Sequence, residues 1–245
     1  MKQMRFNNCV VIGQARVIEG RKTEPHVCTL AINLEAKEEK DLLIRFCPVF
    51  DRKDYCFPKR WSHISFVGTK DNKIHKRDKR YSSWGIDEDY PFDTYDKVSG
   101  SERNEIHKLL LNNFLPEEEL NKQRRSIGVM LPIQPMEFKW VKDESCERHH
   151  KNMDLYHPEK KLMLTGKKNE LDGRLKRFKK TCVAWDVIEA YRKNNEITLS
   201  HNNPYCVIGN VLSHPISWVV VAILSAPDGY IDKYAFKKEH QLSLA

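Results

Sequence analysis

The sequence predicts a mainly β fold with α-helical insertions, of the α+β class. Short runs rich in Val, Ile, Leu or Phe recur through both halves of the 245-residue chain, and Gly, Pro or charged residues bound each run. Two stretches, 103–112 and 184–193, instead have the character of helices. A chain of this length buries enough apolar surface to fold as one large domain or as two smaller ones.

The first β-rich segment indicates a small barrel, because four short strands follow one another closely. These strands are expected at 9–12, 27–34, 42–50 and 63–67. Gly13, Gly20 and Gly68 lie where a tightly coiled sheet requires bends or bulges. A basic hairpin tip at 70–80 is then expected to return the chain into 81–86.

A helical connector is expected over 99–125, between two β-rich segments. Ser101 can cap a helix over 103–112, and Pro116 lies just beyond the apolar stripe of that helix. The preceding run at 87–96 contains five acids and no Lys or Arg, which favours a solvated connector. The alternative is that this acidic run covers the basic hairpin in the absence of ligand.

A second β-rich segment follows, with strands expected at 127–133, 136–141, 205–211 and 218–224. Residues 142–170 mix charges and histidines with few apolar positions, so we expect a long excursion between strands there. Structure resumes over 174–185 and passes into a helix near 184–193. The expected domains are a first barrel at 1–98 and a second barrel at 126–245.

The net charge of +8 is concentrated in two patches. Residues 57–84 carry eight Lys or Arg and two Asp, interleaved with aromatic residues, and residues 160–180 carry nine Lys or Arg and two acids. Cations neutralise phosphates and aromatic faces stack on exposed bases, so this mixture is typical of nucleic-acid binding. The expected binding residues are Lys59, Arg60, Lys70, Lys73, Lys76, Arg77, Lys79, Arg80, Tyr81, Trp84, Arg174, Lys176, Arg177, Lys179 and Lys180.

Other interpretations of the two patches stay open. Phe57, Trp61 and Phe66 are equally consistent with core positions of strands, with the neighbouring charges solvating a hairpin. The patch at 160–180 is equally consistent with an amphipathic surface helix or strand that faces water or an acidic partner protein. Three further aromatic residues in apolar surroundings are expected in the core: Trp185, Tyr191 and Trp218.

One cluster is dense in metal-ligand and base side chains: His149, His150 and His157, with Cys146 nearby. A metal-dependent nuclease centred on these histidines is therefore an alternative function. No strong strand or helix period frames the cluster, which favours a solvated loop. The sequence contains neither a glycine-rich phosphate loop nor a Cys-x-x-Cys pair, so we expect no P-loop, no zinc knuckle, no metal site and no cofactor.

The seven cysteines are odd in number, and most lie in or beside apolar runs. A reduced thiol in such a place behaves as a small hydrophobe, which is typical of a cytosolic protein. Residues 1–6 lack an apolar signal core, and the longest apolar run, 218–224, is too short to span a bilayer. These features predict a soluble, cytoplasmic protein that does not bind membranes.

Several motifs, in their order along the chain, resemble a poorly characterised prokaryotic family described as carrying a dual OB-type domain. They are Cys9-Val10-Val11-Ile12-Gly13, the run from Lys76 to Trp84, Ser126-Ile127-Gly128-Val129, Trp185-Asp186 with Ala190-Tyr191-Arg192, Gly209-Asn210, and His214-Pro215 leading into Trp218-Val219-Val220. The similarity spans most of residues 9 to 224. It implies two small OB-like β-barrels with helical embellishment, nucleic-acid handling, and a setting near genes for antiviral defence or DNA modification.

The acidic residues of the second predicted helix depart from this family. Its pattern favours Asp before the helix Trp and Glu after it, whereas Ala184 and Asp186 stand here. A role for an acidic pair is therefore in doubt. Asp186 and Glu189 share one helical face and can hold Mg²⁺ or form ion pairs with Arg192, and the ion pairs are favoured.

These observations predict a non-enzymatic nucleic-acid-binding protein of two OB-like barrels, an accessory component of a prokaryotic defence or DNA-modification system. Single-stranded or distorted nucleic acid is favoured, because small barrels present curved faces with stacking rings and no recognition helix is evident. The two basic patches are expected to form one groove. The alternatives are the histidine-centred nuclease and a basic adaptor that binds an acidic protein partner in a multi-subunit complex.

Overall fold

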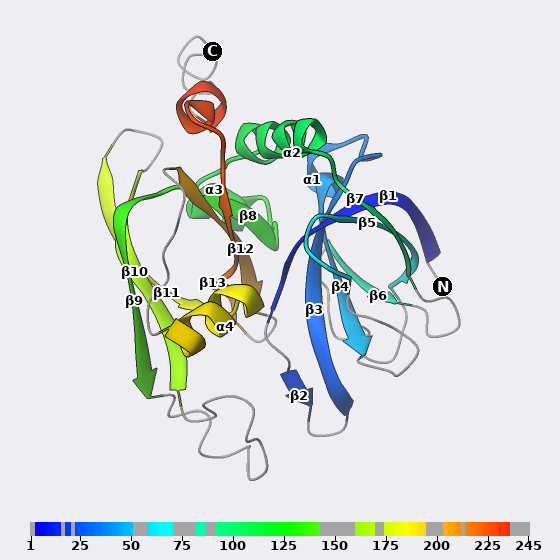
Figure 1. The fold of residues 1–245 in the computed structure, drawn as a ribbon, viewed down its shortest axis with the longest axis horizontal. Coiled ribbons are helices and arrows are strands. Elements are labelled where there is room, and N and C mark those ends of the chain that lie inside the picture. The colour runs from blue at the N-terminus through cyan, green and yellow to red at the C-terminus, as the bar shows by residue number, and fades with distance from the viewer. Residues whose placement is uncertain are drawn as a thin grey trace.

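We describe the protein from a computed structural model (Figure 1). The description covers residues 3–15, 18–20, 23–50, 58–70, 82–86, 92–142, 160–169, 174–194, 203–211 and 214–235. Within these residues the chain is mainly β, as the sequence predicts, and forms a closed five-stranded barrel and a second sheet of six strands.

The first sheet closes on itself because β1 pairs with both β3 and β5. Its strands are β1 (Gln3–Gln14), β2 (Ile18–Gly20), β3 (Thr23–Asn33), β4 (Leu43–Phe50), β5 (Ser62–Thr69), β6 (Ser83–Ile86) and β7 (Asp93–Lys97). The barrel order is β1-β3-β4-β6-β5, and β4 and β6 are parallel neighbours. Strands β2 and β7 pair with β3 and β5 outside the closed ring.

The barrel forms where the apolar runs predict strands, and its interior is filled by aromatic side chains. Phe6 stacks on Phe66 with ring centroids 4.7 Å apart, and Trp84 meets Phe6 edge-on at 5.1 Å. Phe66 is therefore a core residue, as one of the two interpretations proposed. The ladder between β1 and β3 shifts register between Val11 and Gly13, which confirms the bulge expected at this glycine.

The second sheet runs in the order β8-β12-β13-β11-β10-β9. Its strands are β8 (Ile127–Met130), β9 (Pro132–Lys142), β10 (Lys160–Asn169), β11 (Leu175–Cys182), β12 (Pro204–Val211) and β13 (His214–Ser225). The two ends of this path, β8 and β9, are consecutive in the chain and separated only by Leu131. Strands β11 and β13 are parallel neighbours, and the other pairings are antiparallel.

Strand β10 corrects the expectation of an excursion over 142–170, which is wrong for residues 160–169. Leu162 and Leu164 point into the core with at most 1% of their surface exposed, while lysines flank them on both sides. Two leucines are enough to cover the buried face of this short strand. The four lysines around them nevertheless make the run polar on average, so it does not stand out as a strand in the sequence.

The helical elements are α1 (Glu39–Leu42), α2 (Gly100–Asn112), α3 (Glu117–Lys122), α4 (Trp185–Asn194) and a π-helical segment η2 (Ile231–Ala235). Helices α2 and α4 confirm the two helices predicted from sequence. The N-cap of α2 is Ser99, whose hydroxyl accepts a hydrogen bond from the Glu102 amide at 3.2 Å, so the expectation of Ser101 as the cap is wrong. The acidic run at 87–96, predicted as a connector, contributes residues 93–96 to the exposed strand β7 (Asp93–Lys97).

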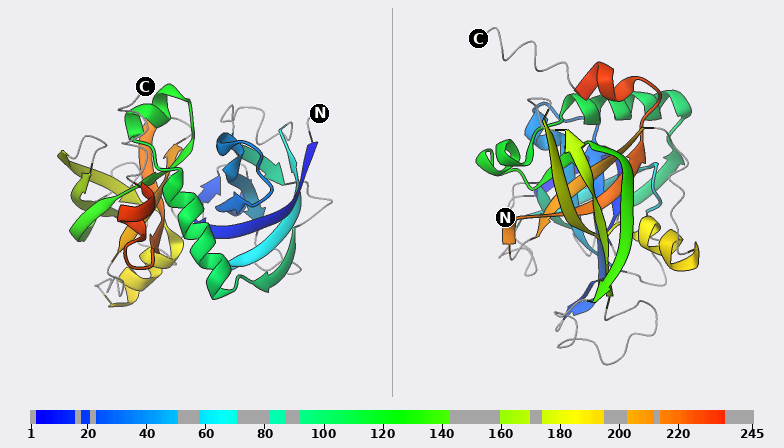
Figure 2. Two further views of the ribbon diagram at one scale, coloured as in Figure 1. Left: turned by 90° about the horizontal axis from the view of Figure 1, so that it is seen from above. Right: turned by 90° about the vertical axis from the view of Figure 1, so that its left-hand side faces the viewer.

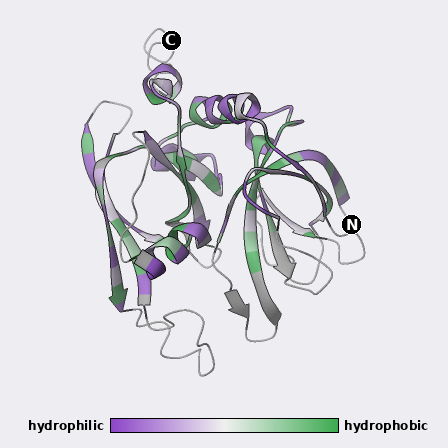
Figure 3. Cartoon of the chain, in the orientation of Figure 1, coloured by the Kyte–Doolittle hydropathy of each residue, from purple (hydrophilic) through white to green (hydrophobic). Residues whose placement is uncertain are grey.

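The two sheets share one hydrophobic cluster at their junction, called the shared core below. It combines Val10 and Leu30 of the barrel with Val207 and Val221 of the second sheet and with the buried side of α2. Each sheet also has a hydrophobic cluster of its own. Viewed from above, α2 lies across the line where the sheets meet (Figure 2). Hydrophobic and hydrophilic residues are interspersed along β10 and β11 (Figure 3), as expected where one face is buried, whereas β8 and almost all of β12 are buried on both faces.

A buried arginine also joins the sheets. Arg45 of β4 is 6% exposed, and its guanidinium donates hydrogen bonds of 3.2 Å to the carbonyl oxygens of Asn210 and Ser126. A Cβ atom on Gly13 would lie 2.7 Å from the Cβ of Ala222, so only glycine permits this approach of β1 to β13. The barrel and the second sheet thus meet through packed side chains.

Trp218 is 5% exposed and packs in the second sheet, which confirms it as a core residue. Its indole nitrogen donates to Asn121 Oδ1 at 3.1 Å. Cys9, Cys182 and Cys206 are buried free thiols, and burial raises the pKa of Cys9 and of Cys182 to about 12. In the described part of the chain, no helix has the length and apolar character needed to cross a bilayer.

Candidate nucleic-acid interface

The outward face of β9, β10 and β11 carries a cluster of cations. In the antiparallel ladders Lys167 lies opposite Arg177, and Met163 lies opposite Lys139, so each pair shares a face of the sheet. Alternate residues along a strand also share a face, which adds neighbours two positions away. The cations of this surface, called the basic face below, are Lys139, Lys161, Lys167, Arg177 and Lys179, and its acid is Glu137.

Four cations of the basic face are exposed: Lys139, Lys167, Arg177 and Lys179. None of these four forms an ion pair with another residue that the structure describes. Arg174 and Lys176 are also exposed, but Lys176 lies opposite Lys168 and so belongs to the other face of β11, where its Nζ is 3.9 Å from Glu118 Oε1. A group of exposed cations attracts the phosphates of a nucleic-acid chain and replaces their counterions.

The opposite face of the same strands points into the core and contains an internal ion-pair cluster. Lys168 and Lys180 are 8% and 9% exposed, and both bind Glu117 of α3, at 2.7 Å to Oε1 and 2.9 Å to Oε2. Burial alone would raise the pKa of Glu117, but hydrogen bonds from the two lysines outweigh burial and hold that pKa below its ordinary value. Lys180 is therefore not available to nucleic acid, which corrects the expectation for this residue.

In the first predicted patch, residues 57–84, most of the predicted binding side chains that the structure describes make contacts within the protein. Trp84 is 6% exposed, and the Lys70 ammonium lies 4.2 Å from its ring centroid and donates to the Ser83 carbonyl oxygen. The prediction of Trp84 as a base-stacking ring is therefore wrong, because Phe6 and Lys70 cover it. Lys59 is exposed.

Several predicted site residues lie outside the described residues. They are Lys73, Lys76, Arg77, Lys79, Arg80 and Tyr81 of the first patch and the histidines His149, His150 and His157. Among the residues that are described, no group of three His, Cys, Asp or Glu side chains is arranged to hold a metal ion.

The acidic residues of α4 form ion pairs, as the sequence favoured. Glu189 accepts two hydrogen bonds from Arg192, at 3.2 and 3.0 Å. Asp186 instead pairs with Arg60 of the first sheet, with Arg60 Nη1 2.8 Å from its Oδ2. Arg60 also donates to the carbonyl oxygen of Ile223 at 3.3 Å, so this predicted binding residue holds the two sheets together.

A pocket of about 510 Å³ lies beside Arg60 at the junction of the sheets, and we call it the seam pocket. The turn before β5, the helix α2 and the chain after β13 form its walls. Its lining residues are Arg60, Trp61, Arg103, Asn104, His107 and 223–228. The lining is polar enough to suit a charged ligand, and the volume is that of a small-molecule site.

Trp61, in the lining of the seam pocket, has an unfavourable backbone conformation. Its φ is 63°, in the left-handed region, where a bulky residue costs on the order of 1–3 kcal/mol. The Trp61 amide donates to the Val11 carbonyl at 2.8 Å, and its own carbonyl accepts from the Val98 amide at 2.9 Å. These two bonds fix the turn, and the Arg103 guanidinium lies 4.9 Å from the Trp61 ring.

His107 forms the buried floor of the seam pocket. It is 3% exposed, and its Nδ1 lies 2.7 Å from the hydroxyl oxygen of Tyr205. Burial, and then the nearby charge of Arg103, lowers the pKa of His107 to about 4, so the ring is neutral at pH 7. A neutral imidazole leaves Arg60, Arg103 and Asp228 as the charged side chains of the pocket lining.

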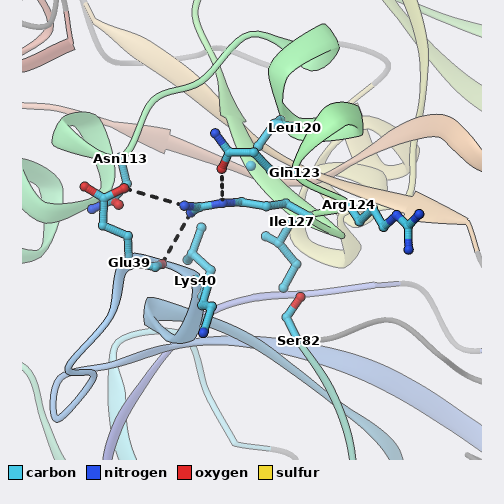
Figure 4. Close-up of a pocket in the computed structure, with 11 residues that line it drawn as sticks. Glu39, Lys40, Ser82, Asn113, Leu120, Gln123, Arg124 and Ile127 are labelled. Carbon is cyan, nitrogen blue, oxygen red and sulfur yellow. Dashed lines mark hydrogen bonds and ion pairs between the residues drawn. The ribbon is translucent and has the colours of Figure 1, made fainter.

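A second pocket of about 510 Å³ lies on another side of the junction, between α1, α3 and β8 (Figure 4). Arg125 crosses it and is already paired, with Nη2 3.5 Å from Glu39 Oε2 and Nε donating to Gln123 at 3.0 Å. Arg124 points away from these contacts, and its φ of 53° belongs to the left-handed residue that ends α3. Helix termination accounts for its conformation.

Sequence reasoning did not single out Lys139, Lys161, Lys167, Arg103 or His107. Alternation along the predicted strand 136–141 could have indicated Lys139, and Lys161 and Lys167 could have been found in the same way had β10 been recognised. Arg103 and His107 come together with Trp61 only through tertiary packing, and no local pattern signals that. Neither a protein-family model nor a curated protein matches the chain.

Proposed function

We propose that this protein binds nucleic acid without sequence specificity, mainly through contacts of the basic face with phosphates. The observation that carries the proposal is the row of cations on β9, β10 and β11, where the described residues include five cations and the single acid Glu137. No internal ion pair uses the exposed members of this row among the described residues. Such a surface has little structural value for the protein itself, because like charges on neighbouring strands repel.

Strand order supports two OB-like barrels as the scaffold. The first barrel runs β1-β3-β4-β6-β5, and β5 returns to β1. If β8 and β9 are two halves of one bent strand, the second sheet has the matching order, with β10, β11, β13 and β12 in the equivalent places. The single parallel pairing also matches, since β4–β6 corresponds to β11–β13.

The place of the basic face agrees with this scaffold. OB folds bind oligonucleotides on the face of their second and third strands and with the adjoining loops. In the second sheet those strands are β10 and β11, which carry Lys161, Lys167, Arg177 and Lys179. The charge of the basic face and the strand order of the second sheet are independent observations that support the same binding surface.

Phosphate contacts are favoured over base stacking. Tyr95 is the exposed aromatic residue of the described chain, at 54%, and it lies on β7, away from the basic face. Without rings on that face, affinity comes from charge, so single-stranded and double-stranded molecules of equal charge density should bind alike. The expected preference for single strands then depends on Tyr81 of the first patch, which lies outside the described residues.

Charge reversal on the basic face tests the proposal. A Lys167→Glu, Arg177→Glu, Lys179→Glu protein should bind labelled oligonucleotides more weakly in fluorescence anisotropy. The slope of log affinity against log salt should become shallower by roughly 2–3 units, since about one counterion is released per phosphate contact. The matched control is Lys122→Glu, Arg124→Glu, Lys233→Glu, which changes the net charge equally at exposed positions on α3, its C-terminal end and η2.

The control should retain the salt slope of the parent protein. Equal losses in both variants would mean that net charge alone drives binding, and parent-like binding by the face variant would remove the basic face from the account. An accessory, non-enzymatic role in a prokaryotic defence or DNA-modification system is the setting we propose, on the resemblance of motif order.

A further inference from the structure

The seam pocket contains a positive charge that the described protein does not neutralise. Arg103 forms no ion pair with another described residue, and its Nε is buried without a hydrogen-bond partner. A buried donor left without an acceptor is unfavourable, and native structures retain few of them. The atom is therefore positioned for an acceptor that a ligand would supply.

The position of Arg103 in its helix adds to this imbalance. It is the fourth residue of α2, close to the N-terminus, where the helix dipole disfavours a cation. Its guanidinium also lies against the ring of Trp61, which the backbone holds at φ 63°. The strained backbone of Trp61 and the unfavourably placed cation of Arg103 thus occur in one pocket. Binding of an anion there would compensate the charge of Arg103, and strained residues often cluster at binding sites.

A second guanidinium, that of Arg60, lines the same pocket. Arg60 is fixed by Asp186 at 2.8 Å and by the Ile223 carbonyl at 3.3 Å, so its orientation is set before any ligand arrives. Planar guanidinium groups bind phosphate oxygens through paired hydrogen bonds, and a fixed group loses little entropy on binding. Asp228 is the acid of the lining, and its Oδ1 accepts a hydrogen bond from Asn203 at 2.8 Å.

We propose that the seam pocket binds a terminal phosphate group, with Arg103 as its main contact and Arg60 as a second contact. A free nucleotide and the phosphorylated end of a nucleic-acid strand present the same chemistry. The pocket shares no residue with the basic face, so it is a separate site from the surface proposed above.

Calorimetric titration of the full-length protein tests this site. AMP should bind and adenosine should not, and Arg103→Gln should weaken AMP binding about ten- to a hundredfold, the range for a lost charge-assisted hydrogen bond. The matched control is Arg124→Gln, an exposed arginine outside the seam pocket that should bind AMP like the parent. The indole N–H signal of Trp61 should shift on titration with inorganic phosphate.

Oligonucleotides distinguish the two sources of the phosphate. A 5′-phosphorylated strand that binds more tightly than its 5′-hydroxyl counterpart, with the gain lost in Arg103→Gln, identifies a strand end. AMP binding with no such gain identifies a free nucleotide. Absence of AMP binding at millimolar concentration, or equal binding by Arg103→Gln and the parent, would overturn the proposal.

A second variant keeps the test decisive if Arg103→Gln does not fold. Asn104→Asp places a negative charge at an exposed position of the pocket lining and should weaken AMP binding while circular dichroism stays unchanged. AMP affinity equal to that of the parent would count against the pocket. Loss of nucleic-acid binding in the basic-face variant leaves this result unaffected, so the two proposals fail independently.

Discussion

Glu117 shows how a single residue organises one side of the second sheet. It is the first residue of α3, and its two carboxylate oxygens each bind a different lysine of neighbouring strands. The lysines are almost completely buried, so they have no access to water as a substitute partner. A carboxylate in this position stabilises the fold because its removal leaves two buried charges unpaired.

We expect Glu117→Gln to lower the free energy of unfolding by roughly 2–3 kcal/mol at pH 7. The folded-state pKa of Glu117 lies below its ordinary value, so its contribution is complete above about pH 4.3, the unfolded pKa, and is lost as pH falls through the folded pKa. Urea denaturation of parent and variant at several pH values should therefore converge under acid conditions.

Glu118→Gln provides the matched control for this experiment. Its side chain is 80% exposed and lies 3.9 Å from Lys176, so solvent screens the pair and the expected change is within about 0.5 kcal/mol. A loss for Glu118→Gln as large as that for Glu117→Gln would show that general charge on α3, and not the buried cluster, sets stability.

At the scale of elements, the sequence predicted most of the strands and both long helices, because their apolar spacing is local. Strand β10 was missed because only Leu162 and Leu164 mark its buried side. The site was predicted in part: Arg177 and Lys179 lie on the basic face, whereas Lys180, from the same run, points inward to Glu117. Successive side chains of a strand point to opposite faces, so Lys179 and Lys180 can be assigned to different faces only when the segment is known to be a strand.

Gly13 permits a close approach of β1 to β13 at the junction of the two sheets. A methyl group on Gly13 would lie 2.7 Å from Ala222 Cβ and 3.0 Å from the Val221 carbonyl oxygen. We expect Gly13→Ala to lower the free energy of unfolding by about 1–3 kcal/mol, because the strands must separate or distort. Thermal or urea denaturation measures the loss.

Ala222→Gly removes the nearest clashing atom, so the double variant should recover part of the stability lost by Gly13→Ala. Gly100→Ala is the control, since a methyl group there meets nothing within 4 Å at the start of α2 and should be neutral or slightly stabilising. Additive effects of the changes at residues 13 and 222 would contradict the steric account.

At the scale of the whole molecule, the shared core makes the two sheets interdependent. The boundaries predicted from sequence assign the two sheets to separate domains, yet Val10, Leu30, Val207 and Val221 belong to one cluster. Sequence patterns report which residues are apolar but not which sheet buries them. This is why the junction, with its buried Arg45 and the seam pocket, could not be predicted.

We expect fragments 1–98 and 99–245 to fold poorly when produced separately, because each would expose its half of the common cluster to water. The fragments should bind the dye ANS and lack a sharp urea transition. The full-length protein should unfold in one transition, with tryptophan fluorescence and far-ultraviolet circular dichroism coinciding. A fragment 1–98 that unfolds cooperatively on its own would show that the barrel is an independent domain.

The common core also determines how ligands of this protein can be found. If the molecule melts as one unit, any ligand that binds the native state stabilises all of it, wherever the ligand sits. At a concentration of 100 times Kd the gain is about 2.7 kcal/mol, which for a chain of this size raises Tm by roughly 5–10 °C. A simple melting screen of nucleotides, short oligonucleotides and anions would therefore report on the basic face and the seam pocket alike.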